Sequence, residues 1–285
     1  MSAHAAEPKS NLRDYQKLSR SGKIKTATQN KSTIVIRLTL LTLLALTIYG
    51  FLTFNYGNVN FFQAVIDSLR NAMIMFTQPQ LTHASFSGVM YALLITFAMA
   101  FLATIFGAII AFFGALMCAQ NIARPSISLV IRSITGFIRA VPAILWILIF
   151  SVAAGLGSVA AVAGLTLAAV GYLIKAYSES IEEMDYGCIE ALKASGASYW
   201  QIVCQAIIPA SISYLVAWTF LRFEISFTNA VIVGAAAGAG GIGWDLFMAA
   251  NFYFDLRELG FITLIAVAAV VLLEMIATRV KASVR

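Results

Sequence analysis

The sequence predicts an all-α polytopic membrane protein with about six transmembrane helices. Hydrophobic residues make up 60% of the 285 residues, and charged residues make up only 11%. The mean hydropathy is +0.86, whereas a soluble domain carries about 25% charged residues. Apolar runs long enough to cross a bilayer, about 20 residues each, recur along the chain. Together these observations indicate an integral membrane protein rather than a soluble domain.

Six apolar runs are the candidate transmembrane helices. They cover residues 32–54, 86–118, 126–150, 156–177, 203–235 and 259–280. The runs 86–118 and 203–235 exceed what a straight crossing of about 30 Å requires at about 1.5 Å per residue, so each must tilt, break or protrude. Pro142 and Pro209 lie close to the start of a run. A missing backbone N–H costs least there, so we expect both prolines to begin helices.

The positions of Lys and Arg predict the topology. Seven basic residues lie in segment 1–31, which the positive-inside rule places in the cytoplasm. With six crossings, alternation places most other basic residues on the same side: Arg124, Arg132, Arg139, Lys175, Lys193, Arg279, Lys281 and Arg285. We therefore expect a multi-pass protein of the bacterial plasma (inner) membrane with both termini in the cytoplasm. Topology accounts for the net charge of +6, so membrane lipid is an expected partner and nucleic acid is not.

The chain divides into three predicted segments. Residues 1–31 form a cytoplasmic basic tail beside anionic lipid. Residues 32–85 hold the first transmembrane helix and a helix along the outer interface, in which apolar side chains from Phe62 to Leu69 share one face. Residues 86–285 form the core.

Cysteine and histidine are too few to suggest a metal or redox site. Cys118, Cys188 and Cys204 all fall on the predicted cytoplasmic side, where thiols stay reduced, so no disulfide is expected. His4 and His83 are the only histidines, and they are far apart in the sequence. We therefore expect no metal ion.

The segment 178–209 is a long polar insertion on the predicted cytoplasmic side. Two short helices, 190–195 and 197–203, are predicted with Gly196 as an elbow between them. A helix, an elbow and a second helix suit docking into a groove on another protein. The expected contact residues are Glu190, Ala191, Lys193, Gly196 and Ala197.

This segment resembles the EAA coupling loop of ABC importer permeases. Glu190-Ala191, Gly196 six residues later and Pro209 thirteen beyond the glycine match that signature, with apolar replacements at Leu192, Ala206 and Ile208. The resemblance implies a type I ABC importer permease fold whose loop seats in an ATP-binding subunit. The alternative is an ordinary amphipathic connection between two helices.

A second resemblance, over about residues 86–280, is to the permease subunit of phosphonate ABC transporters. It rests on Glu190 to Ala197, Ser213-Tyr214, Leu221 to Glu224 and Gly238 to Gly243, in this order and spacing. After Glu224 this family often has a further basic residue, whereas Ser226 to Asn229 are neutral. The resemblance implies alternating-access import of phosphonates or related phosphorus oxyanions, delivered by an extracytoplasmic binding protein.

The chain has no nucleotide-binding motif of its own. No G-x-x-x-x-G-K-[ST] occurs in it, so we expect no cofactor on this chain. The resemblance implies that ATP and Mg are held by a partner ATPase. The implied assembly contains two ATP-binding subunits. Because the permease elements occur once and no internal repeat is evident, a homodimer of the permease is the economical arrangement.

Two ionisable residues lie within the fifth run. Intramembrane charges are costly and are functional candidates by default. Arg222 and Glu224 are two positions apart and project to different sides of a helix, so each needs its own partner. Arg222 shares a helical face with Thr219, Ser226 and Asn229. These five residues are candidates for the substrate pathway, and the alternative is that the charges form intersubunit salt bridges or snorkel to the outer interface.

The glycines from Gly238 to Gly243 fit the G-x-G-x-x-G pattern of a dinucleotide-binding turn. Such a turn needs a soluble parallel sheet, which the chain lacks. The spacing of Gly234 and Gly238 instead favours close approach of membrane helices. We predict a gate at the outer mouth formed by Gly234, Gly238, Gly240, Gly241 and Gly243.

Two other classes of function remain open. The chain is consistent with a permease for another small solute, such as an amino acid, phosphate or phosphite. A polytopic membrane enzyme or scaffold is the alternative outside transport. We expect no enzyme, because no intramembrane nucleophile with a base and no cluster of His, Asp and Glu is evident.

Overall fold

The computed structural model describes residues 31–53 and 60–283. The predicted basic tail therefore lies outside the described residues, except for Lys31. The chain forms two compact units, Met1–Ala64 and Val65–Arg285, and each is described by itself.

The first unit contains a single long apolar helix, α1 (Lys31–Thr53), which matches the first predicted run. Four threonines on this helix, from Thr39 to Thr53, donate their hydroxyl groups to the carbonyl four residues earlier, at 2.8–2.9 Å. Their polar groups are thereby satisfied within the helix, as a lipid environment requires. The next helix, α2 (Phe61–Thr77), is amphipathic as expected and continues beyond the predicted segment 61–70.

The second unit is a bundle of helices. After α2 it contains α3 (Phe86–Cys118), α4 (Pro125–Ala140), α5 (Ala143–Ala154), α6 (Ser158–Glu182), α7 (Tyr186–Ala194), α8 (Tyr199–Ile202), the π-helix η2 (Val203–Ile207), α9 (Ile208–Ala236), α10 (Ile242–Asn251) and α11 (Leu256–Ser283). No strand occurs in residues 31–53 or 60–283. The all-α fold class is confirmed.

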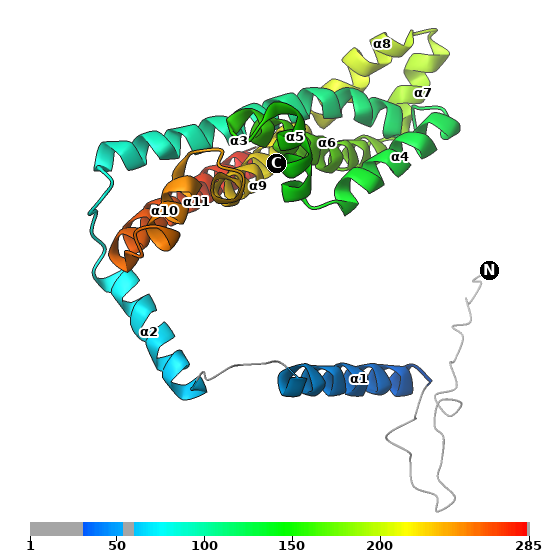
Figure 1. Ribbon diagram of the computed structural model, residues 1–285. Coiled ribbons are helices and arrows are strands. Elements are labelled where there is room, and N and C mark those ends of the chain that lie inside the picture. Colours follow the sequence, from blue (N-terminus) through cyan, green and yellow to red (C-terminus); the bar gives the residue numbers. More distant parts are fainter. Residues whose placement is uncertain (1–30, 54–59, 284–285) are drawn as a thin grey trace, which may run out of the picture. The chain divides into compact units, whose positions relative to one another are not determined.

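Helix α6 lies at the centre of the bundle and packs against α3, α4, α5 and α9 (Figure 1). Glycines allow the close contacts. A Cβ atom on Gly107 of α3 would lie 2.6 Å from the Ala169 Cβ on α6, and one on Gly171 of α6 would lie 2.7 Å from Ile138 on α4. Small residues at helix crossings are the usual means by which membrane helices approach closely.

The predicted run 126–150 does not form one straight crossing. Helices α4 and α5 meet at an angle of 91°. Pro142 stands at the start of α5, where it lacks an N–H to continue α4 and restricts the residue before it to an extended conformation. The expectation that Pro142 begins a helix is confirmed. Within the described residues, five helices are individually long and apolar enough to cross a membrane, or six if the bent pair counts as one span.

The long run 203–235 is interrupted near its start. The π-helix η2 precedes α9, and Pro209 lies in the first turn of α9. Because proline has no N–H and its ring crowds the carbonyl four residues earlier, a wider turn there relieves the clash. The break falls next to the predicted helix-start proline.

Candidate functional site

Helices α7 and α8 project from one end of the bundle (Figure 1). Asp185 caps α7, because its carboxylate accepts a hydrogen bond from the Gly187 N–H at 2.9 Å. The pair of helices confirms the predicted helix, elbow and helix, although α7 begins at Tyr186, four residues before the predicted start.

The elbow is built by a defined turn. The Gly196 N–H donates to the Lys193 carbonyl and the Ala197 N–H donates to the Leu192 carbonyl, each at 3.0 Å. This is the Schellman pattern of a helix C-terminus, which requires a left-handed residue after the cap. Gly196 supplies it with φ +81°. The next helix starts at once, because Ser198 and Gln201 form a capping box.

One face of the loop packs on the bundle and the other face is exposed. Ile189 and Ile202 are buried, and Leu192 and Ala197 pack against the same apolar cluster. The predicted contact residues Glu190, Ala191, Lys193 and Gly196 are exposed. The fifth predicted contact residue, Ala197, is half-buried against the core.

The single cation of this exposed face is held in place by an aromatic ring. Lys193 Nζ lies 3.4 Å from the Tyr186 hydroxyl and 5.4 Å from the centre of its ring. The contact spans two turns of α7 and stiffens the face. Beside it, a cavity of about 830 Å³ opens between α7 and the start of α9, with Cys188, Leu192 and Pro209 on its walls.

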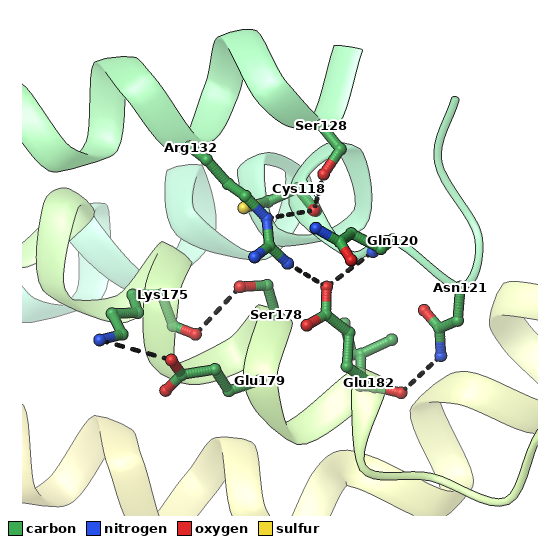
Figure 2. Close-up of polar contacts among 10 residues, drawn as sticks. Cys118, Gln120, Asn121, Ser128, Arg132, Lys175, Ser178, Glu179 and Glu182 are labelled. Atoms are coloured by element: carbon green, nitrogen blue, oxygen red, sulfur yellow. Dashed lines mark hydrogen bonds and ion pairs between the residues drawn. The ribbon is translucent and has the colours of Figure 1, made fainter. Parts of the chain in front are cut away.

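The root of the loop is tied by an ion pair that sequence reasoning missed. Figure 2 shows the Arg132 guanidinium of α4 against the Glu182 carboxylate at the end of α6. The same carboxylate accepts the Gln120 N–H at 2.7 Å. Asn121 donates to the Ile181 carbonyl at 2.8 Å. Helices α3, α4 and α6 are thus joined three residues before the α7 cap.

The predicted pathway residue Arg222 is buried inside the protomer, with 5% of its surface exposed. Its Nε and Nη2 atoms have no hydrogen-bond partner among the described residues. The guanidinium carbon lies 5.5 Å from the centre of the Tyr172 ring on α6, within the range of a cation–π contact. The side chain therefore does not snorkel to an interface, and no carboxylate of the described residues forms an ion pair with it.

The polar stripe on α9 surrounds Arg222 as predicted, with different degrees of burial. Ser226 is fully buried and its hydroxyl has no partner in the described part of the chain. Thr219 lies 2.5 Å from the Tyr177 hydroxyl of α6. Asn229 is partly exposed. One face of α9 thus carries two buried polar side chains, Arg222 and Ser226, with hydrogen-bonding atoms that have no partner among the described residues.

Glu224 lies apart from Arg222, as their two-residue spacing predicts. It lines a cavity of about 460 Å³ between α6, α9 and α11, together with Glu179, Glu183 and Glu274. An acidic wall repels an anion. The structure therefore separates the two charges into different environments.

The glycines after α9 pack tightly against their own protomer. A Cβ on Gly234 would lie 2.7 Å from the Gly240 carbonyl oxygen, and one on Gly243 would overlap the Val231 carbonyl oxygen. The Ile242 N–H donates to the Thr96 hydroxyl of α3 at 2.9 Å. Gly234 and Gly243 thus let α10 fold back onto α9.

The prediction that Gly234 and Gly238 together allow close helix approach is wrong for Gly238. Helix α9 ends at Ala236, and Gly238 lies beyond it with φ +59° and open space around it. Gly238, Gly240 and Gly241 all have positive φ, so they shape the connection. The close helix approach belongs to Gly234 and Gly243.

A second contact missed by sequence reasoning closes the same end of the bundle. Glu258 at the start of α11 is 1% exposed. Its carboxylate accepts the Ala84 N–H at 2.6 Å and approaches the His83 Nδ1 at 2.8 Å. His83 stacks on Tyr253 with ring centres 4.1 Å apart. The charge of Glu258 at the start of an apolar run was the only sequence signal of this contact, since its partners His83 and Ala84 lie 175 and 174 residues away in the chain.

Asp255 completes this group. The ligand atoms of His83, Asp255 and Glu258 lie within 4.8 Å of one another, but Glu258 is already engaged by N–H donors. Burial opposes the charged form of Asp255, yet hydrogen bonds from Thr82 and from the Glu258 and Arg257 N–H groups prevail and lower its pKa. These contacts describe an N-cap and a clamp on the loop before α3.

The bundle of long apolar helices, with its projecting pair α7 and α8, defines the class of a polytopic helical membrane protein. Residues 110–284 match the family of binding-protein-dependent transport system inner membrane components. This match covers more than half of the chain, and the chain belongs to this family. The expectation of a transporter subunit rather than an enzyme agrees with it.

Several curated relatives are permeases for phosphorus oxyanions. The phosphate-import permease PhnE of Mycolicibacterium smegmatis is 30% identical over 153 residues, covering 53% of this chain and 29% of the relative. The phosphite transport system permease PtxC of Stutzerimonas stutzeri is 31% identical over 174 residues, covering 61% of each chain. The chain thus spans less than two thirds of either relative. A permease of Escherichia coli named for a cryptic phosphonate transport system is 29% identical over 111 residues, covering 39% and 89%.

Solved structures with the same fold are amino-acid importers. A chain of the inward-facing MetNI methionine ABC transporter has a TM-score of 0.65 at 22% identity, covering 72% of this chain and 100% of its own. A chain of an amino acid ABC transporter has a TM-score of 0.57 at 19% identity, covering 80% and 100%. The predicted type I ABC importer permease fold is confirmed.

Proposed function

We propose that the chain is the permease subunit of an ATP-driven importer for phosphonates or related phosphorus oxyanions. The substrate arrives from an extracytoplasmic binding protein and crosses by alternating access. Two partner ATP-binding subunits hold ATP and Mg, and a second copy of the permease completes the pathway. The complex lies in the bacterial inner membrane with both termini of this chain in the cytoplasm.

The observation that carries the substrate class is the state of Arg222. A buried guanidinium with two nitrogens lacking partners is costly, because each unsatisfied buried donor costs about 1–3 kcal/mol. An oxyanion that reaches it supplies the missing acceptors, and Ser226 supplies a further hydroxyl. A bound phosphorus oxyanion thereby gains charge-assisted hydrogen bonds in a low-dielectric setting. The relatives named for phosphate and phosphite transport support the same class.

The coupling loop is joined directly to the helix that covers Arg222. Helix α6 carries Tyr172, which faces the guanidinium, and ends at Glu182 just before α7. We infer that closure of the ATP-binding subunits moves α7 and α8 through the exposed face at Glu190, Ala191 and Lys193. This motion shifts α6 against α9 and opens Arg222 to the pathway.

The glycine connection is the proposed gate. Gly238 and Gly240 have open space around them and positive φ values, whereas Gly234 and Gly243 anchor the two flanking helices. Rotation about the open glycines moves α10 without unpacking its anchor. Contact between the two permease copies at this segment is part of the same proposal.

The second candidate is an importer of methionine or another amino acid, which the solved structures favour by fold. An amino acid carries a carboxylate, which Arg222 attracts, and also an ammonium group, which methylphosphonate, phosphite and phosphate lack and which the acidic cavity at Glu224 and Glu274 attracts. Dependence of transport on Glu224 therefore distinguishes the two candidates.

The test is ATP hydrolysis by the reconstituted complex, stimulated by binding protein loaded with methylphosphonate, phosphite, phosphate or methionine. We expect stimulation by the phosphorus oxyanions and its loss in Arg222→Gln. Arg257→Gln, which removes an exposed arginine on α11, is the matched control. Stimulation by methionine alone, lost in Glu224→Gln, would show the second candidate to be correct.

A further inference from the structure

A small basic cavity lies at the root of the coupling loop, away from Arg222. Its volume is about 210 Å³, and its walls include three cations and one carboxylate: Arg132, Arg139, Lys175 and Glu179, beside Cys118, Thr135 and Ser178. The basic side chains come from α4 and α6. Figure 2 shows Arg132 on α4 and Lys175 on α6, with Ser178 between their side chains.

The cations of this cavity are unequally neutralised. Arg132 is paired with Glu182. Lys175 lies 3.4 Å from Glu179, and both side chains are about half exposed, so solvent weakens that pair. Arg139 takes part in no ion pair among residues 32–53 and 60–279, whose side chains the structure describes. The cavity therefore has a basic excess.

Thr135 provides a polar group that the protein leaves unused. It is 4% exposed, and its hydroxyl has no hydrogen-bond partner in the described part of the chain. Threonines in helices usually donate to the carbonyl four residues earlier, as Thr104, Thr166 and Thr263 do here at 2.7–2.8 Å. Thr135 departs from this pattern while lining a basic cavity.

We propose that this cavity binds a phosphorus oxyanion, either a free phosphate or phosphonate or the phosphate of an anionic lipid headgroup. Arg139 and Lys175 supply charge, and the Thr135 hydroxyl donates to an anion oxygen. Basic pockets between membrane helices on the cytoplasmic side suit such groups. The anion also competes with Glu182 for Arg132, so its binding loosens the tie at the root of the coupling loop.

Binding at this cavity is measured without transport, so its failure and the failure of the proposed function are distinguishable. The experiment uses the permease in complex with its ATP-binding subunits, with the nucleotide sites filled with ADP and Mg. One arm measures binding of radiolabelled inorganic phosphate by equilibrium dialysis. The other arm counts retained phosphatidylglycerol by native mass spectrometry.

Two variants and one control decide the outcome. Arg139→Gln removes the unpaired charge, and Thr135→Val keeps the shape while removing the hydroxyl. Arg124→Gln makes the same charge change at an exposed arginine that does not line the cavity. We expect binding at least about tenfold weaker in Arg139→Gln, and weaker in Thr135→Val, because hydrogen bonds and charge both contribute.

The two arms identify the source of the anion. Loss confined to phosphate shows a free anion, and loss confined to phosphatidylglycerol shows a lipid headgroup. If Arg139→Gln and Thr135→Val behave like Arg124→Gln with both probes, or if neither probe binds, the site does not exist.

Discussion

Replacing Arg222 with methionine should make the complex more stable and inactive at the same time. The structure leaves two buried nitrogens of Arg222 without partners. Each unsatisfied donor costs about 1–3 kcal/mol, and replacement by an apolar group of similar shape removes that cost. The variant also loses the contact with Tyr172, which contributes about 2 kcal/mol when desolvated.

The balance of these effects is a gain of up to about 4 kcal/mol in the free energy of unfolding. Thermal unfolding of the purified complex, followed by tryptophan fluorescence at one scan rate, measures the change as a higher unfolding temperature. Arg257→Met is the control, because Arg257 is exposed and its replacement should leave the unfolding temperature unchanged. Substrate-stimulated ATP hydrolysis should be lost only in Arg222→Met.

A lower unfolding temperature in Arg222→Met would refute this reasoning. It would mean that Arg222 is a structural residue whose charge is compensated, for example by an anion on the neighbouring subunit. Retained transport in a stabilised Arg222→Met variant would separately refute the pathway role.

Three further changes test other parts of the structure. Gly196→Pro removes the N–H bond to Lys193 and forbids φ +81°; ATP hydrolysis should no longer respond to the binding protein, and unchanged transport would contradict the coupling role. Gly243→Ala should abolish assembly of the complex, because the added Cβ overlaps the backbone. Gly238→Ala has room for the Cβ and should cost only about 1 kcal/mol of backbone strain. Equal loss of the assembled complex in size-exclusion chromatography of the two variants would contradict the assigned packing. Asp255→Ala should cost about 1 kcal/mol at pH 7. Folding lowers the pKa of Asp255, so its contribution to stability is present above the unfolded value of about 3.9 and disappears as the pH falls through the folded value. The difference in unfolding temperature between the parent protein and Asp255→Ala should therefore narrow in that acidic range and not at neutral pH.

The long helices and the coupling loop could be predicted from the sequence because their signals are local. Apolar runs set the ends of α1, α3 and α6 to within a few residues, and the glycine after Ser195 marks the elbow. The Schellman turn and the capping box that follow it depend only on neighbouring residues. Such features need no knowledge of tertiary structure.

The bend between α4 and α5 shows where local information ends. Pro142 indicates that a helix starts there, but the 91° angle also depends on how both helices pack against α6. The hydropathy of the sequence is continuously apolar across the break between α4 and α5, so it does not indicate the bend.

The polar contacts at the two ends of the bundle were beyond sequence reasoning for a similar reason. Arg132 and Glu182 are 50 residues apart, and His83 and Glu258 are 175 residues apart. The position of Arg132 was equally explained by the topology rule, without any partner. The polar stripe around Arg222, by contrast, lies on the single helix α9, so residue spacing predicted that its members share a face. The burial of Arg222 against α6 could not be predicted from spacing.

Uptake of radiolabelled methylphosphonate into proteoliposomes tests the central claim most directly. The vesicles contain the permease with its ATP-binding subunits, and the binding protein is supplied on the side opposite to ATP. We predict uptake that requires ATP and the binding protein, that unlabelled phosphite reduces and methionine does not, and that Arg222→Gln abolishes. Uptake of methionine but of no phosphorus oxyanion, or methylphosphonate uptake that persists in Arg222→Gln, would contradict the account.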